Sequence, residues 1–193
     1  CHGTTEYLLD SNGNEREQAN YCYFPSTWAE NIVEQAEKDG LRLSYHTPYR
    51  LNIHRDEFCE LAWQTIQTVN PNINLPELAQ PFSDCDEDIV RQIAALGIVT
   101  GYEDGTFQPT RELSRQEAAV ILQRLYTVLY GKIEASPTLY ADNGSIGAWA
   151  KDSVYAMRQT GIMQGVGANR FDPKNGYTCE QSIITMLRMT QKA

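Results

Sequence analysis

Three stretches of the chain carry apolar residues at the three- and four-residue spacing of an amphipathic helix. The clearest lies between Ala118 and Leu129, where Ile121, Leu122 and Leu125 share one helical face. Two further stretches repeat this pattern, one with Phe58, Leu61, Ala62 and Ile66, the other with Ile183, Met186, Leu187 and Met189. The spacing therefore predicts three helices, each with one buried face.

A shorter amphipathic segment precedes each of these helices. We expect helices over about 27–39, 85–96 and 147–160, the second with Ile89, Ile93 and Leu96 on its apolar side. Each segment ends at a glycine, which suits the left-handed conformation that closes a helix C-terminus: Gly40, Gly97 and Gly161. The pattern predicts six principal helices and a mainly α fold.

The chain repeats itself at an offset of 64 residues. Gly97-Ile98-x-x-Gly101 recurs as Gly161-Ile162-x-x-Gly165, and Phe107-x-Pro109 recurs as Phe171-x-Pro173. A weaker first copy begins at Trp28-Ala29, which matches Trp149-Ala150, and its loop is three residues shorter. Since two short helices cannot bury their faces alone, we expect the three helix pairs to pack as one pseudo-threefold unit.

Shifts in composition divide the chain. We predict an extension, or the tail of an upstream domain, over 1–25, with a turn at Ser11-Asn12-Gly13-Asn14. The three copies are assigned to 26–70, 80–131 and 138–192, the first of them degenerate.

The second helix of each copy opens with a capping motif. Ser114-x-x-Glu117 and Thr178-x-x-Gln181 place a hydroxyl at the N-cap and a carboxylate or amide three residues later, and His54-x-x-Glu57 is a poorer version. Glu57 and Glu117 could instead be paired catalytic carboxylates, but capping explains both of them. No catalytic residue is therefore assigned.

Charge and composition narrow the function. The net charge of −9 argues against a nucleic-acid partner, because no cluster of Lys and Arg is present to neutralise phosphates. The sequence has no apolar run long enough to cross a bilayer. The five cysteines and three histidines lack the spacing of a metal site, so we expect no metal or cofactor and mostly buried cysteines.

The second copy resembles the S-layer homology (SLH) repeat of bacterial surface proteins. It has the aromatic-x-Asp start, Phe82-x-Asp84, the glycine loop from Gly97 to Pro109, and Leu113-Ser114-Arg115-Gln116-Glu117. The third copy keeps Tyr140-x-Asp142 and the loop but has Cys179 where the family has arginine. The resemblance covers about residues 26–192.

This resemblance implies a binding module and not an enzyme. Grooves between the repeats of the family bind a secondary cell-wall polysaccharide, often with acidic pyruvylated sugars, and so anchor a secreted or surface protein to the bacterial cell wall. The chain is then expected to be a monomer and part of a larger protein. The alternative is a structural or protein-interaction module that has lost glycan binding. A third possibility is an enzyme whose catalytic domain precedes the chain.

Arg55 and Arg115 are the main candidates for glycan binding. Both fall in the first turn of a helix, where a cation is unfavourable by roughly 0.3 to 1 kcal/mol. They can form a carboxylate site together with helix N–H groups, or they can pair with a nearby acid or be solvated.

Seven other residues are candidates with simpler alternatives. Gly101 and Gly165 could let a sugar approach the backbone, with Tyr102 as a stacking platform, or they could serve turn geometry and packing. Asp84 and Asp142 could accept sugar hydroxyls, although helix capping is favoured. Trp28 and Trp149 are assigned to core packing in preference to sugar stacking.

Overall fold

The computed structural model describes residues 7–9, 15–17, 23–43 and 48–192. They form six α-helices, which confirms the mainly α fold: α1 (Glu30–Lys38), α2 (Arg55–Val69), α3 (Asp88–Ala95), α4 (Arg115–Tyr130), α5 (Lys151–Gln159) and α6 (Cys179–Thr190). Two short 3-10 helices, η2 (Asn143–Ser145) and η3 (Ala148–Ala150), precede α5. None of the described helices is long and apolar enough to cross a membrane.

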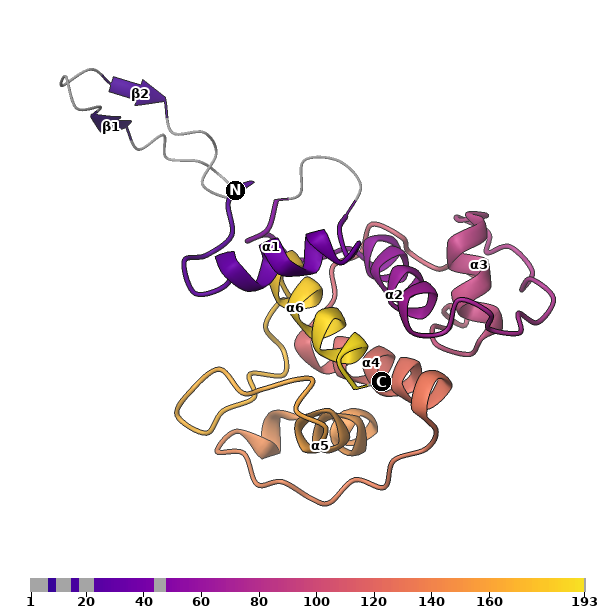
Figure 1. Cartoon of the computed structure of the whole chain (residues 1–193). Helices are drawn as coiled ribbons and strands as arrows, with labels where there is room; N and C mark the ends of the chain where they lie inside the picture. Colours follow the sequence, from indigo (N-terminus) through magenta and orange to yellow (C-terminus); the bar gives the residue numbers. More distant parts are fainter. Residues whose placement is uncertain (1–6, 10–14, 18–22, 44–47, 193) are drawn as a thin grey trace.

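A small antiparallel hairpin precedes the helices. It pairs β1 (Tyr7–Leu9) with β2 (Glu15–Glu17) and lies apart from the helices in Figure 1. The predicted turn at residues 11–14 falls outside the described residues, as do Cys1 and Cys22.

The predicted helix ends agree with the structure more closely than the predicted starts. Gly40, Gly97 and Gly161 follow α1, α3 and α5 with φ of 89°, 72° and 74°, the left-handed conformation expected of a C-terminal glycine. The first helices begin three or four residues later than predicted. The predicted face of α3 is wrong at Ile89, which is 36% exposed, whereas Ile93 is fully buried.

The helices pack between the sequence copies. Helix α3 packs against α2, α5 against α4, and α1 against α6, so that the last helix of the chain covers the first (Figure 1). One continuous core includes the apolar faces of α2, α4 and α6 and three buried free cysteines, Cys59, Cys85 and Cys179. Each first helix thus depends on a second helix from a neighbouring copy.

Three backbone hydrogen bonds form a closed ring where the segments before α2, α4 and α6 meet. The N–H of Ile53 donates to the Tyr177 carbonyl (2.8 Å), that of Tyr177 to Leu113 (2.9 Å) and that of Leu113 to Ile53 (3.1 Å). All three residues are buried. The ring places the first residues of α2, α4 and α6 around one centre; the pseudo-threefold packing of whole repeats and the repeat boundaries stay predictions.

Candidate functional site

Arg55 and Arg115 are the first residues of α2 and α4, and both are buried, with 8% and 4% exposed. Their guanidinium groups bind carbonyl oxygens of the next glycine loop. Arg115 donates from Nε to Phe171 (2.8 Å) and from Nη2 to Gln164 (2.9 Å). Arg55 donates in the same way to Phe107 (2.9 Å) and Thr100 (3.0 Å).

These contacts argue against the two simpler alternatives for the arginines, whereas their role in glycan binding stays a prediction. Within the described residues neither arginine has a carboxylate partner, and both are too buried to be solvated, so both simpler alternatives are wrong. The Arg115 guanidinium also lies over the Phe171 ring, 5.0 Å from its centroid. Burial lowers the pKa of Arg115, but an arginine side chain remains a cation at physiological pH.

Arg115 lines a pocket of about 440 Å³ between the third glycine loop, α6 and the start of α1. Arg188 of α6 is the second charged residue of the pocket, and no carboxylate of the described residues contributes to the lining. The remaining lining residues are Trp28, Met163, Gln164, Gly165, Val166, Tyr177, Gln181, Ile184 and Thr185. In a chain with a net charge of −9, the pocket is therefore a local positive site with apolar walls.

Arg188 was not among the sequence candidates. It occupies the position that Arg124 holds in the second copy, 64 residues earlier, and its Nη1 donates to the Ile162 carbonyl at 3.2 Å. The recurrence of arginine at positions 124 and 188 is the sequence signal that could have identified Arg188 as a candidate.

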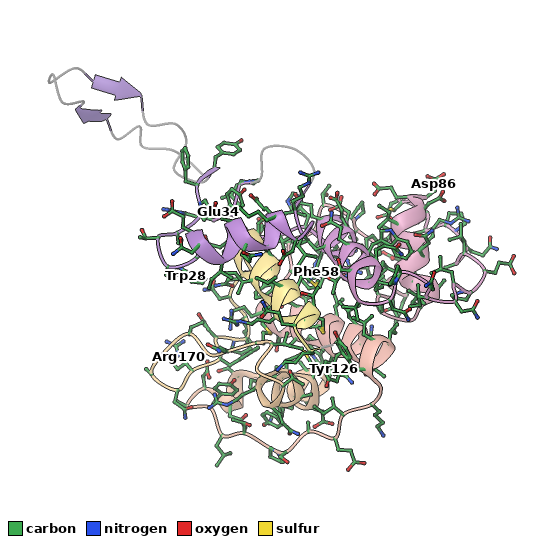
Figure 2. The ribbon with its side chains drawn as sticks, viewed as in Figure 1. Trp28, Glu34, Phe58, Asp86, Tyr126 and Arg170 are labelled. Carbon is green, nitrogen blue, oxygen red and sulfur yellow. The ribbon has the colours of Figure 1, made fainter. Side chains whose placement is uncertain are left out.

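The assignment of Trp28 and Trp149 to the core is wrong. Their side chains are 57% and 61% exposed, and Trp28 stands at the edge of the Arg115 pocket. Both precede the amphipathic helices that they were expected to join, so neither faces the core. Figure 2 shows Trp28 at the start of α1.

Asp84 and Asp142 hold the glycine loops and do not cap helices, contrary to expectation. Asp142 accepts hydrogen bonds from the backbone N–H groups of Phe171 (2.9 Å) and Asp172 (2.7 Å). Asp84 accepts those of Phe107 (2.7 Å) and Gln108 (2.8 Å) in the second loop. Each aspartate thus fixes the loop whose carbonyl groups receive an arginine.

We expect Asp142→Asn to lower the free energy of unfolding by about 1–3 kcal/mol at pH 7, because the charged acceptor of two backbone donors is lost. Burial raises the pKa of Asp142, but the N–H groups of Phe171 and Asp172 outweigh it and leave the pKa below its usual value. The wild-type carboxylate therefore stabilises the fold above about pH 4 and loses this effect as pH falls through its lowered pKa.

Urea denaturation at pH 7 and at pH 3 tests this prediction. The difference between wild type and Asp142→Asn should shrink at pH 3, whereas the exposed Asp86 gives a control variant, Asp86→Asn, with little effect at either pH. A difference of equal size at both pH values would contradict it.

The capping residues make most of the expected contacts. Glu117 accepts from the N–H of Ser114 (2.9 Å), and Glu57 accepts from the N–H of His54 (2.8 Å). Thr178 accepts from the N–H of Gln181 (3.3 Å), but the side chain of Gln181 does not complete the capping box. Its Oε1 accepts from Arg115 instead, at 3.2 Å.

The two glycine positions are tightly enclosed. A Cβ atom at Gly165 would lie 2.5 Å from the Arg170 carbonyl oxygen, and one at Gly101 would lie 2.6 Å from the Phe82 ring. Tyr102, the expected stacking platform, lies at the Arg55 junction and has its hydroxyl group bonded to Arg111. We call the contact of Arg55 with the second glycine loop the Arg55 junction, and that of Arg115 with the third glycine loop the Arg115 junction. The structure thus divides the predicted site residues between these two junctions.

One group of described side chains has metal-ligand geometry despite the expectation from histidine spacing. Ligand atoms of His54, Asp56 and Glu57 lie within 4.8 Å of one another. The two carboxylates already accept backbone N–H groups, those of Glu57 and His54, and the positive end of α2 opposes a cation there. We make no metal assignment for this group.

Comparison with known proteins extends the resemblance. The family model of the S-layer homology domain matches residues 83–119 and 139–176, together less than half of the chain. An S-layer protein of Bacillus thuringiensis subsp. finitimus is 33% identical over 100 residues, which cover 52% of this chain and 12% of that protein.

Two relatives have the names of enzymes. An endoglucanase of Bacillus sp. (strain KSM-635) is 32% identical over 107 residues, which cover 53% of this chain and 11% of the enzyme. An amylopullulanase of Thermoanaerobacterium thermosulfurigenes is 24% identical over 178 residues, which cover 86% of this chain and 9% of the enzyme. The chain thus spans about an eighth or less of these relatives. The matches support an S-layer homology domain in this chain and indicate a location at the cell surface or cell wall.

Proposed function

We propose that this chain anchors a larger surface protein to the bacterial cell wall by binding an anionic secondary cell-wall polysaccharide in the Arg115 pocket. The observation that carries the proposal is the pocket lining, in which the described part of this acidic chain places two arginines and no carboxylate. A pocket of about 440 Å³ lies within the range of small-ligand sites.

The pocket residues match the chemistry of an acidic sugar. Guanidinium groups bind carboxylates through charge-assisted hydrogen bonds, so Arg115 and Arg188 suit the carboxylate of a pyruvyl ketal or a uronate. Trp28 and Val166 are 57% and 48% exposed and offer apolar surface to the face of a sugar ring. No catalytic step is assigned to these residues.

The relatives support the anchoring role. One is named as an S-layer protein and another, from Acetivibrio thermocellus, as cell surface glycoprotein 1. The low coverage of each relative agrees with a module that accompanies other domains. Cys179, which replaces the family arginine, favours the second candidate, a structural or protein-interaction module without glycan binding.

Co-sedimentation with purified cell-wall polymer tests the proposal. The chain is incubated with native polymer and with polymer whose acidic substituents have been removed chemically. We expect binding to the native polymer and at least a tenfold loss with the neutral one. Equal binding to both would overturn an anionic ligand, and no binding to either would favour the second candidate.

A further inference from the structure

The junctions at Arg55 and Arg115 share a backbone arrangement, and three of the side chains that differ between them matter here. At the 64-residue offset, Tyr102, Arg111 and Glu117 of the second copy correspond to Val166, Asn175 and Gln181 of the third. We call the first three residues the Tyr102 latch. They lie around Arg55, whereas their counterparts belong to the Arg115 junction.

The Tyr102 latch is held together by its own contacts. The Tyr102 ring contacts two guanidinium groups, with centroid distances of 5.1 Å to Arg55 and 5.6 Å to Arg111. Arg111 donates to the Tyr102 hydroxyl group and, from Nη2, to Glu117 Oε1 at 2.7 Å. Tyr102 thus lies against the Arg55 guanidinium group and is fixed there through Arg111, which is paired with Glu117.

The counterparts form no such latch at Arg115, which lines the pocket although only 4% of the residue is exposed. Val166 is 48% exposed and lines the pocket beside Arg115. The Asn175 side chain donates to Asp172 (3.2 Å), and Gln181 accepts from Arg115 itself. Val166 therefore leaves the position of Tyr102 without a ring, and the second ring beside Arg115 is that of Tyr177, 5.7 Å from the guanidinium carbon and itself part of the pocket lining.

The charge at one position also distinguishes the two junctions, since Glu117 corresponds to Gln181. Burial raises the pKa of Glu117, but hydrogen bonds from Ser114 and Arg111 outweigh it and lower the pKa, so the carboxylate is ionised at neutral pH. An anion entering beside Arg55 would meet this carboxylate. At Arg115 the same position is held by the neutral Gln181.

The third junction lies at the start of α6. It has no arginine at the position equivalent to Arg55 and Arg115, and none at the position equivalent to Arg124 and Arg188. Cys179 is the first residue of α6 and is fully buried. Gln64 stands where Arg124 and Arg188 stand in the other copies, and its side chain binds the backbone of Arg42 at 2.9 and 2.7 Å. This junction lacks the cations of the Arg115 pocket.

We propose that the chain has one open anion site, at Arg115, and that the Tyr102 latch closes a second, equivalent site at Arg55. The inference rests on the proposed function and specifies its stoichiometry. It assigns Tyr102, Arg111 and Glu117 as the residues that exclude a second acidic sugar.

Isothermal titration with short acidic oligosaccharides released enzymatically from native cell-wall polymer tests this proposal. We expect one site per wild-type chain. In a variant with Tyr102→Val, Arg111→Asn and Glu117→Gln, which carries the side chains of the third copy, we expect two. Adding Arg115→Ala to this variant should leave one site, at Arg55.

Single variants of the wild type keep the test decisive if the triple variant folds poorly. Arg55→Ala should keep one site, with an affinity within about twofold of the wild type, whereas Arg115→Ala should abolish the single site. Three results would each overturn the proposal that the latch closes a second site. They are two sites in the wild type, loss of a site in Arg55→Ala, and a folded triple variant with one site. Absence of binding by the wild type would instead contradict the proposed function.

Discussion

Arg115→Ala is expected to weaken binding to acidic cell-wall polymer at least 30-fold. The substitution removes a buried cation from the pocket, and loss of one partner of a buried charge pair costs about 2–5 kcal/mol. At about 1.4 kcal/mol per tenfold change, this range corresponds to a loss of roughly 30-fold or more. Depletion of the protein from solution by increasing amounts of polymer measures the effect.

Arg55→Ala is the matched control for this prediction. Both arginines begin a helix, both are buried, and each donates two hydrogen bonds to carbonyl groups of a glycine loop. The two variants should lose similar thermal stability, so any difference in binding reports the pocket. If both lost binding equally, the effect would come from loop disruption and the site assignment would fail.

Gly165→Ala is expected to destabilise the fold by about 1–3 kcal/mol. Its new methyl carbon would lie 2.5 Å from the Arg170 carbonyl oxygen and 3.3 Å from the Tyr140 ring, so backbone has to move. That carbonyl accepts the N–H of Val166, and the shift would therefore strain the turn that forms the pocket wall. For a chain of this size, we expect the melting temperature to fall by roughly 2–12 °C.

Gly144→Ala provides the comparison. Nothing lies within 4 Å of a Cβ atom at Gly144, and its φ is not positive, so this substitution should change the melting temperature by less than about 2 °C. Thermal unfolding followed by circular dichroism distinguishes the two variants. Equal melting temperatures would show that the third loop yields to a side chain at position 165 without cost.

The helices could be predicted because their signals are local. The apolar spacing in α2, α4 and α6 and the closing glycines Gly40 and Gly97 depend on residues within one or two turns. Helix starts were less accurate at Trp28 and Trp149, since an aromatic residue before an amphipathic segment reads equally well as its first buried position. Exposure depends on which neighbouring copy packs there.

The site could be predicted only in part, because its contacts join distant segments. The position of Arg115 at a helix start was visible, but its partners Gln164 and Phe171 lie 49 and 56 residues away. The same holds for Asp142, which reaches Phe171 across 29 residues. Capping competes with such contacts for the same side chain, and local spacing does not decide between them.

The ring formed by Ile53, Leu113 and Tyr177 has a consequence for how the chain folds. The bond between Ile53 and Tyr177 joins positions 124 residues apart, and α1 packs on α6 at the opposite end of the chain. A linear array can fold one repeat at a time, whereas here the main helix–helix contact of α1 forms only when α6 has been made. Contacts of such high sequence separation slow folding, so we expect a single cooperative transition and no stable product when the chain is truncated before α6.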